Sequence, residues 1–469
     1  MAKAYENKLT NPIKKYEGSD NDMVIHLTKL WEAKKTTFGR NVNFDELPED
    51  INLLNFKNTL SKISDNLVFR GNFGAYDNEL EKEMSLTKKS VVLDKKNCKT
   101  LYLCLNDLIK YNSIRSELFD KIKFADIFIK HKKGDNTDPK NFRFLSNHTK
   151  IFKIIDKFWT NSLINTLEKN NALPDKSIVK NNFSREYSVS IRDLALEKVI
   201  KVSNGKKIVL LDIQKAFDSV SWTSLNELVT KNITRKIGKQ YAERMMAQYM
   251  FLNTNRCILF QNNKINCYRS IATGLPSSTI VFSLLIEEII YQWKKEVNAS
   301  DVIVNTYVDD MYLEFNDTSN SLFLVDSLIK FLKKYNLIIN ESKTKTNIET
   351  LPYSQIEKSD CYLGLPFADN KEDYIAECVK MFNDRYYNLT VDEIVDIIKN
   401  DDRKVRKEII GFFNYKLYGL KKFEKNLEID VLNILDNFNN NTKDDFNVFL
   451  FFISFLVECF NLILKIFKL

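Results

Sequence analysis

Two neighbouring acids, Asp309 and Asp310, stand between two runs of β-prone residues. Residues 302–304 and 311–315 are rich in Val, Ile, Leu, Tyr and Phe, which predicts a β-hairpin with both carboxylates at its tip. Adjacent carboxylates repel each other, so such a tip is either fully solvated or built to hold a cation. The pair is therefore the first candidate for a metal site.

A third acid, Asp212, follows the apolar run 208–211 and marks the expected carboxyl end of a buried strand. A charge at such a position is costly unless it is paired or bound to a metal. An antiparallel sheet can bring Asp212 beside the other two acids. Three carboxylates placed in this way can hold two divalent ions about 3.5–4 Å apart, which activate a 3′-hydroxyl and stabilise a leaving pyrophosphate. Just beyond, we expect helix capping by Asp218 or Ser221.

Composition limits the classes of protein to consider. The chain has 469 residues, of which 44% are hydrophobic and 28% charged, with only 11 Gly and 7 Pro. This length suggests roughly two to four domains, and the scarcity of helix breakers favours long helices. A net charge of +8 permits a nucleic-acid partner without demanding one. The seven cysteines form no CxxC pair, which argues against zinc and disulfides, and the N-terminus lacks a signal pattern, so we expect a cytoplasmic protein.

A basic segment lies upstream of the acids. Residues 124–130 and 141–145 predict two strands, joined by a polar, Gly-containing turn. Such a loop can arch over a polyanion, and Lys130 and Arg143 can then meet a triphosphate, with Arg143 offering its bidentate fork. An ordinary cationic hairpin is the alternative interpretation.

The segments between these motifs predict further elements. Helical periodicity covers residues 149–167 and 322–334, and a second hairpin is expected at 256–268. The small residues of the turn at 273–279 either let a base pair approach the backbone or simply cap the helix that follows from residue 280. Residues 337–339 predict a strand that leads into a polar turn.

Residues 1–115 predict helices with no recognisable chemistry. Residues 371–440 predict helices in which basic and aromatic residues interleave, which suits either a nucleic-acid groove or a solvated face over core aromatics. The last 24 residues, 446–469, are strongly apolar, although Glu458 interrupts them. A packed or oligomerising helix is the first interpretation and a membrane anchor the second, because a central Glu is costly in a bilayer.

Taken in order, these motifs resemble the fingers and palm of a reverse transcriptase, an RNA-directed DNA polymerase, of the non-LTR and group II intron kind. The resemblance covers about half of the chain, and the matching stretches are residues 132–135 with 141–143, 211–218, 274–278, 307–310, 340–345 and 363–364. It implies an α+β fold in which a right-hand polymerase with an antiparallel palm sheet is flanked by helical regions. The implied boundaries are 1–115, 116–368 for fingers and palm, 369–445 for a thumb-like region and 446–469.

The resemblance also implies roles for single residues. Asp212, Asp309 and Asp310 would be catalytic acids that bind Mg²⁺, with Mn²⁺ as an alternative, and Lys343 would act as general acid at the pyrophosphate. The remaining residues would contact the substrates: Lys130 and Arg143 the triphosphate, Phe217 the sugar as a steric gate that selects dNTPs, and Gly274 and Ser277 the templating base pair.

The chain departs from the family where Ser277 replaces the usual Gln and Ser278 the usual Gly. This change removes an amide near the templating base pair and puts ordinary template copying in question. About 100 residues follow the last motif, too few for an RNase H domain plus a thumb, and no HNH cluster or Cys/His zinc motif suggests an integrase or endonuclease. We therefore expect a stand-alone enzyme like the bacterial antiviral-defence (abortive-infection) reverse transcriptases, some of which extend DNA without a conventional template. The implied partners are dNTPs, an RNA template and DNA product, and beyond these a noncoding RNA or a second copy of the chain. The alternatives are a maturase-like nucleic-acid-binding protein with a vestigial site and a membrane-associated effector.

Overall fold

The computed structural model describes residues 16–33 and 125–381, apart from short gaps, and a few positions between 411 and 419. The expected apolar C-terminal helix, most of the N-terminal helical region and most of the thumb-like region lie outside these residues. The chain divides into two compact units. The larger unit comprises Lys15–Ser188 and Lys207–Ser354, and the smaller comprises Met1–Lys14, Val189–Lys206 and Gln355–Leu469. The expected mixture of helices and sheets is confirmed.

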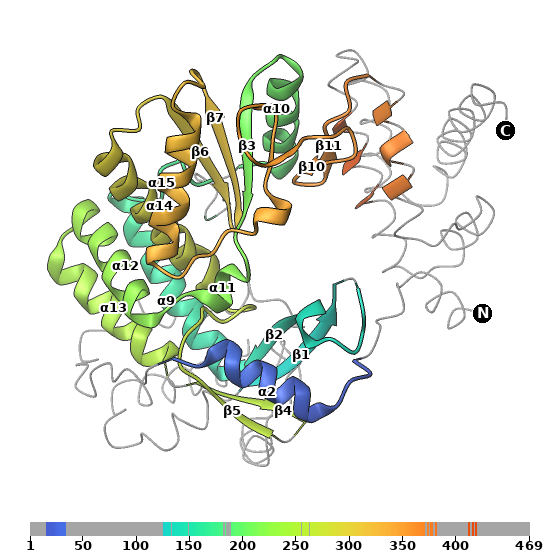
Figure 1. Ribbon diagram of the computed structural model, residues 1–469. Helices are drawn as coiled ribbons and strands as arrows, with labels where there is room; N and C mark the ends of the chain where they lie inside the picture. Colours follow the sequence, from blue (N-terminus) through green and yellow to red (C-terminus); the bar gives the residue numbers. More distant parts are fainter. Residues whose placement is uncertain are drawn as a thin grey trace, which may run out of the picture. The chain divides into compact units, whose positions relative to one another are not determined.

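A five-stranded sheet lies at one end of the larger unit, at the top of Figure 1. Its strands lie in the order β6-β7-β3-β8-β9, and β3 pairs antiparallel with both β7 and β8. The strands β6 and β7 form the hairpin predicted around the two adjacent acids. The bounds are β3 Lys207–Asp212, β6 Val302–Tyr307, β7 Asp310–Phe315, β8 Lys345–Thr346 and β9 Ser354–Gln355.

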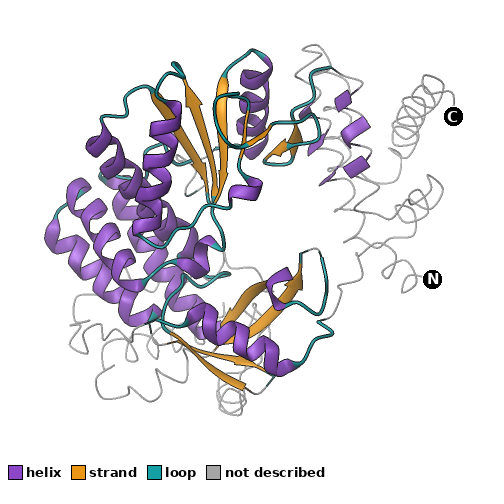
Figure 2. Cartoon of the chain, in the orientation of Figure 1, coloured by secondary structure: helices purple, strands orange, loops and turns teal. Residues whose placement is uncertain are grey.

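Long helices are gathered beside this sheet (Figure 2). The central one, α14, runs Ser278–Val297 and is buried on almost every side, since its apolar residues are not confined to one stripe. It ends at Asn298, whose left-handed φ of 51° makes a common C-terminal cap. The other helices are α9 Lys150–Lys169, α12 Trp222–Lys236, α13 Lys239–Asn253 and α15 Ser321–Lys334.

A second, four-stranded sheet lies in the same unit, in the order β2-β1-β4-β5. Both hairpins predicted from sequence are present in it, and β1 joins them by pairing in parallel with β4. Its strands are β1 Ala125–His131, β2 Phe142–His148, β4 Arg256–Phe260 and β5 Asn263–Cys267.

The helix α2, Asp20–Trp31, packs with this second sheet although it comes from the region expected to form a separate extension. Ser19 caps its N-terminus by accepting the Asp22 N–H at 3.1 Å. Met23, Leu27 and Trp31 form its buried stripe, and the Trp31 carbonyl accepts the Tyr268 N–H at 3.1 Å.

The smaller unit contains the helix α10, Ile191–Ser203, and the short strands β10, Cys361–Tyr362, and β11, Leu365–Pro366. A tight turn with left-handed φ at Leu363 and Gly364 joins the two strands. No helix in the described part of the chain is both long and apolar enough to cross a membrane.

One local prediction was wrong. Residues 337–339 do not form a full strand, because β3 already ends at Asp212 and only a single bridge forms beyond it, between Ile213 and Ile339. Asp218 does not cap a helix. It lies within the one-turn helix α11, Ala216–Ser219, and accepts a hydrogen bond from Trp31 Nε1 at 3.0 Å. The expected capping by Asp218 or Ser221 is confirmed at Ser221, which caps the N-terminus of α12.

Candidate active site

The sheet brings the three acids to one end. Asp212 and Asp310 are direct cross-strand partners at the ends of β3 and β7. Asp309 lies in the two-residue turn between β6 and β7, next to Val308, whose φ is +55°. A β-branched residue rarely adopts this conformation, so the turn is strained where the acids project.

The three carboxylates act on one another. Burial, followed by the charges of Asp309 and Asp212, raises the pKa of Asp310 to about 6. Burial also raises the pKa of Asp309, and the charge of Asp212 adds to that effect. Lys343 offsets part of this repulsion, because its Nζ lies 3.0 Å from Asp212 Oδ2. Excess negative charge of this kind is what a divalent cation relieves.

The acids do not form a complete metal cage by themselves. Among the described residues, no three His, Cys, Asp or Glu side chains converge closely enough to hold one ion. The paired Asp212 and Asp310, with Asp309 beside them, supply hard oxygen ligands suited to Mg²⁺ or Mn²⁺.

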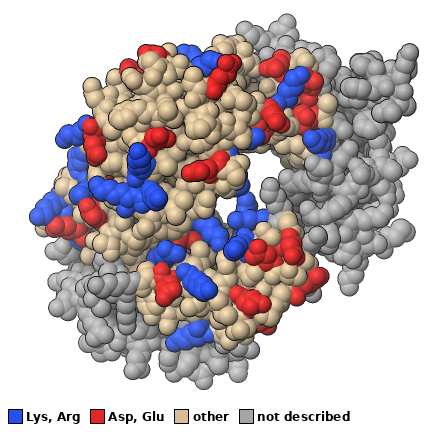
Figure 3. All heavy atoms as spheres, viewed as in Figure 1, with Lys and Arg blue, Asp and Glu red and all other residues tan. Residues whose placement is uncertain are grey.

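The predicted cations lie on the β1–β2 hairpin. Lys130 and Arg143 are cross-strand neighbours with exposed side chains. Arg143 is near enough to the acids for its charge to oppose the rise in the pKa of Asp309. Figure 3 shows Lys and Arg side chains gathered where the four-stranded sheet faces the five-stranded sheet.

Lys132 belongs to the same group but was not singled out by sequence. Desolvation, followed by the charges of Arg143 and Lys343, lowers its pKa, while Asp218 and Asp212 act in the opposite direction. These interactions place its ammonium near both the acids and the other cations. The only signal for it in the sequence was its membership of the basic turn.

His26 and Lys215 form a second contact that the sequence did not reveal. Lys215 stands between Asp212 and Phe217 in the chain with a left-handed φ of 45°, and its Nζ lies 3.1 Å from His26 Nε2. Burial, followed by the charge of Lys215, lowers the pKa of His26 to about 4, so the ring is neutral at physiological pH. The N-terminal helix α2 therefore reaches the motif that carries Asp212.

Phe217, the expected steric gate, is only partly buried. Its ring stacks on Phe282 of α14, with centroids 4.9 Å apart and planes 28° from parallel. Its carbonyl accepts the Ile271 N–H at 2.9 Å. One face of the ring is thus fixed against the core, five residues after Asp212.

The turn that precedes α14 is tied to two neighbouring elements. Gly274 has a φ of +97°, and an added Cβ would lie 3.2 Å from the Ser146 carbonyl of β2. Thr273 Oγ1 donates to the Phe144 carbonyl at 2.7 Å, which attaches the turn to the same strand. Glycine is required here by both conformation and space.

Ser277, predicted to lie beside the templating base pair, contacts a carboxylate in the structure. The residue is fully buried, and its N–H and hydroxyl donate to the Asp156 carboxylate of α9 at 2.9 and 2.7 Å. Burial raises the pKa of Asp156 to about 6 despite these bonds. Its contact with a templating base pair stays a prediction, and its hydroxyl is bonded to a buried carboxylate.

Three acids thus lie at one end of an antiparallel sheet, and the cationic β1–β2 hairpin lies near them. A family model described as reverse transcriptase (RNA-dependent DNA polymerase) matches residues 130–367, about half of the chain, and the chain belongs to this family. Its domain is accordingly that of an RNA-directed DNA polymerase, a nucleotidyltransferase. The match confirms the resemblance drawn from the sequence motifs. A comparison with curated proteins finds no match.

Proposed function

We propose that this protein adds dNTPs to a 3′-hydroxyl by two-metal catalysis at Asp212, Asp309 and Asp310. The observation that carries the proposal is the cross-strand pairing of Asp212 with Asp310, with Asp309 in the adjoining turn. The raised pKa of Asp310 supports it, because mutual repulsion among the acids favours cation binding. Mg²⁺ is the first candidate ion and Mn²⁺ the second.

Bound ions would activate the 3′-hydroxyl and neutralise charge on the leaving pyrophosphate. The chain's own residues do the rest. The three carboxylates hold the ions, and Arg143, Lys130 and Lys132 bind the triphosphate. Lys343 is held at Asp212 before the reaction; once released by cation binding there, it moves to the pyrophosphate and donates a proton.

Phe217 selects the sugar of the incoming nucleotide. A ring fixed on one side against Phe282 leaves little freedom to yield to a 2′-hydroxyl. The family implies an RNA template and a DNA product. Because the hydroxyl of Ser277 is bound to Asp156, we extend the proposal to synthesis that does not require a template, in the manner of the antiviral-defence enzymes that the sequence resembles.

The test is nucleotide incorporation with purified protein. Reactions contain dNTPs with Mg²⁺ or Mn²⁺ and either a primed RNA or no template. Asp309→Asn should abolish incorporation, whereas Asp301→Asn, an exposed acid just before β6, should leave it unchanged. The no-template arm decides the second part of the proposal. Failure of the wild-type protein to incorporate dNTPs in every arm would overturn the whole of it.

A further inference from the structure

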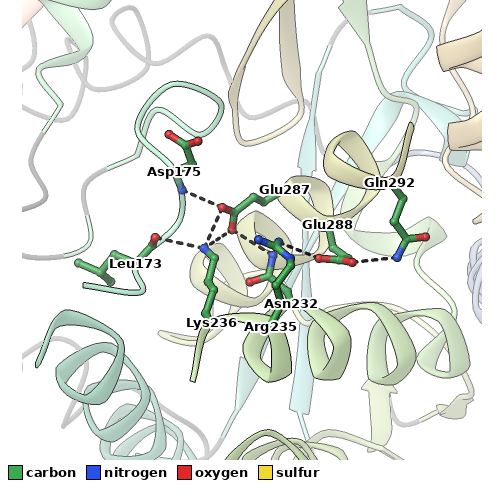
Figure 4. A network of polar contacts seen from close by, with 8 residues as sticks. All are labelled: Leu173, Asp175, Asn232, Arg235, Lys236, Glu287, Glu288 and Gln292. Carbon is green, nitrogen blue, oxygen red and sulfur yellow. Dashed lines mark hydrogen bonds and ion pairs between the residues drawn. The ribbon is translucent and has the colours of Figure 1, made fainter. Parts of the chain in front are cut away.

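Two neighbouring glutamates lie buried in the middle of α14. Glu287 and Glu288 are only 3% and 4% exposed, and Figure 4 shows both with their partners. Carboxylates at such depth are costly unless they are paired. Each has a cation from α12: Lys236 lies 2.6 Å from Glu287, and Arg235 lies 2.9 Å from Glu288.

Glu287 binds a third element as well. Its Oε1 accepts the main-chain N–H of Asp175 at 2.9 Å. Lys236, held by the same carboxylate, also donates to the Leu173 carbonyl at 3.1 Å. Asn232 adds a bond from Nδ2 to Glu287 Oε2 at 3.1 Å. From its position in α14, Glu287 thus bonds to both α12 and the loop at 173–175.

That loop continues into a segment that lies along β6. The Thr306 N–H donates to the Ile178 carbonyl at 2.7 Å, and the Lys180 N–H donates back to the Thr306 carbonyl at 2.7 Å. Asn305 Nδ2 donates to the Ser177 carbonyl. Thr306 is therefore held by the segment 173–181, three residues before Asp309.

Glu288 offers a contrast within the same turn of helix. Its carboxylate accepts hydrogen bonds from Arg235 and Gln292, each at 2.9 Å. Arg235 in turn stacks over Tyr291, with its guanidinium carbon 4.0 Å from the ring centroid. These contacts join α12 and α14 to each other and involve no residue of the segment 173–181.

We propose that Glu287 is a positioning residue for the hairpin that carries Asp309 and Asp310, acting through the segment 173–181 and β6. This inference rests on the proposed function of that hairpin. Without the charge of Glu287, the loop at Asp175 loses its anchor and Thr306 loses support. The acids then hold their ions less well, while the triphosphate contacts on the other sheet remain.

The matched variants are Glu287→Gln and Glu288→Gln, since each removes one buried, cation-paired charge from α14. In Glu287→Gln we expect kcat to fall at least tenfold and the half-saturating Mg²⁺ concentration to rise at least threefold. The KM for dNTP should stay within twofold. In Glu288→Gln all three quantities should stay within twofold of wild type, measured where both variants are folded. Equal losses in the two variants at equal folded fraction would overturn the proposal.

Amide hydrogen exchange gives a readout that requires no activity. The amides of Thr306 and Lys180 should exchange at least tenfold faster in Glu287→Gln and at the wild-type rate in Glu288→Gln. If wild-type protein lacks polymerase activity, the proposed function fails, and exchange still decides whether Glu287 supports β6. Wild-type exchange in Glu287→Gln would overturn the inference alone.

A milder variant covers the case in which Glu287→Gln does not fold. Asp175→Ala, at an exposed position, keeps the main-chain N–H but removes the 2.7 Å bond from the Ser177 N–H to the Asp175 carboxylate. It should raise the same exchange rates about threefold and lower kcat in the same direction. No change in either quantity would count against the proposal.

Discussion

Among the single residues of the candidate site, Asp310 has a carboxylate whose charged form is disfavoured by several effects at once. Burial and the charges of Asp309 and Asp212 raise its pKa to about 6, and the charge of Lys343 opposes this rise. This shift makes the folding stability depend on pH. A folded-state pKa above the unfolded value of 3.8 means that the metal-free fold is stabilised at low pH and loses that contribution as pH rises through about 6.

Asp310→Asn should therefore stabilise the metal-free protein at neutral pH while abolishing polymerase activity. The gain should be on the order of 1–2 kcal/mol, a discounted value because the carboxyl is partly screened by solvent. It should appear only as pH rises from about 4 to 6 and then level off. Urea denaturation in EDTA across this range measures it, with Asp301→Asn as the control. A variant less stable than wild type at pH 8 would contradict the expectation.

Phe217→Ala should relax sugar selection. Removing the ring leaves room for a 2′-hydroxyl. The ratio of kcat/KM for dNTP to that for the matching rNTP should therefore fall by roughly tenfold or more. Phe217→Tyr keeps the ring that stacks on Phe282 and should retain selectivity. An unchanged ratio in Phe217→Ala would assign the ring to core packing alone.

At the scale of elements, the turn before α14 connects the strand β2 with the helix α9. It is bonded to β2 through Thr273 and to α9 through Ser277, while Gly274 lies against the Ser146 carbonyl. The strand β2 carries Arg143. A disturbance in this turn is therefore transmitted to the cationic hairpin.

Gly274→Ala should cost about 1–3 kcal/mol and lower polymerase activity, because a Cβ at positive φ is strained and the Ser146 carbonyl must also give way. Gly205→Ala is the matched control, since Gly205 has a φ of +82° but nothing within 4 Å of an added Cβ. It should show only the smaller conformational cost and leave activity unchanged. Thermal unfolding with a primer-extension assay separates the two. Similar losses in both variants would show that the close approach to Ser146 is unimportant.

Local elements were predictable because their signals are local. The β-prone runs around Asp309 and Asp310 and the polar turns of the other two hairpins each predicted strand pairs that the structure contains. The helix expected over 149–167 runs Lys150–Lys169. The helix expected from 280 begins at 278, because Ser277 and Ser278 are held by the Asp156 carboxylate and the Ala272 carbonyl, which residue periodicity does not reveal.

Contacts between distant parts of the chain were not predictable. Asp156 and Ser277 are 121 residues apart, and Trp31 and Asp218 are 187 apart. An isolated Asp in an amphipathic helix has no pattern that indicates its partner. For the same reason Lys132 and His26 were missed, although the three acids, whose spacing matches a family motif, were found. Their roles as metal ligands remain predictions.

At the scale of the whole molecule, α2 extends the larger unit beyond the residues that match the family. Trp31 is buried at the end of this helix, and its indole N–H satisfies Asp218, whose pKa is raised by burial. The larger unit thus includes chain that precedes the family match, which begins at residue 130.

Trp31→Ala should cost about 3–5 kcal/mol, because it leaves a large cavity and removes the donor from a buried carboxyl. Trp31→Phe should retain part of the packing and separate the two causes. Ile25→Ala, at an exposed position of the same helix, should change stability by no more than about 0.5 kcal/mol. Urea unfolding followed by circular dichroism measures all three. A loss in Trp31→Ala no larger than in Ile25→Ala would mean that α2 is dispensable.

The segment beside β6 has a consequence for association between molecules. In the strand order of the described sheet, β6 lies at an edge, where free N–H and C=O groups can recruit a strand from another chain and start aggregation. Both main-chain groups of Thr306 are already taken by residues 178 and 180. The end of β6 next to the turn at Val308 and Asp309 is therefore closed to strand addition, so residues 178–180 protect this edge of the sheet from pairing with another chain.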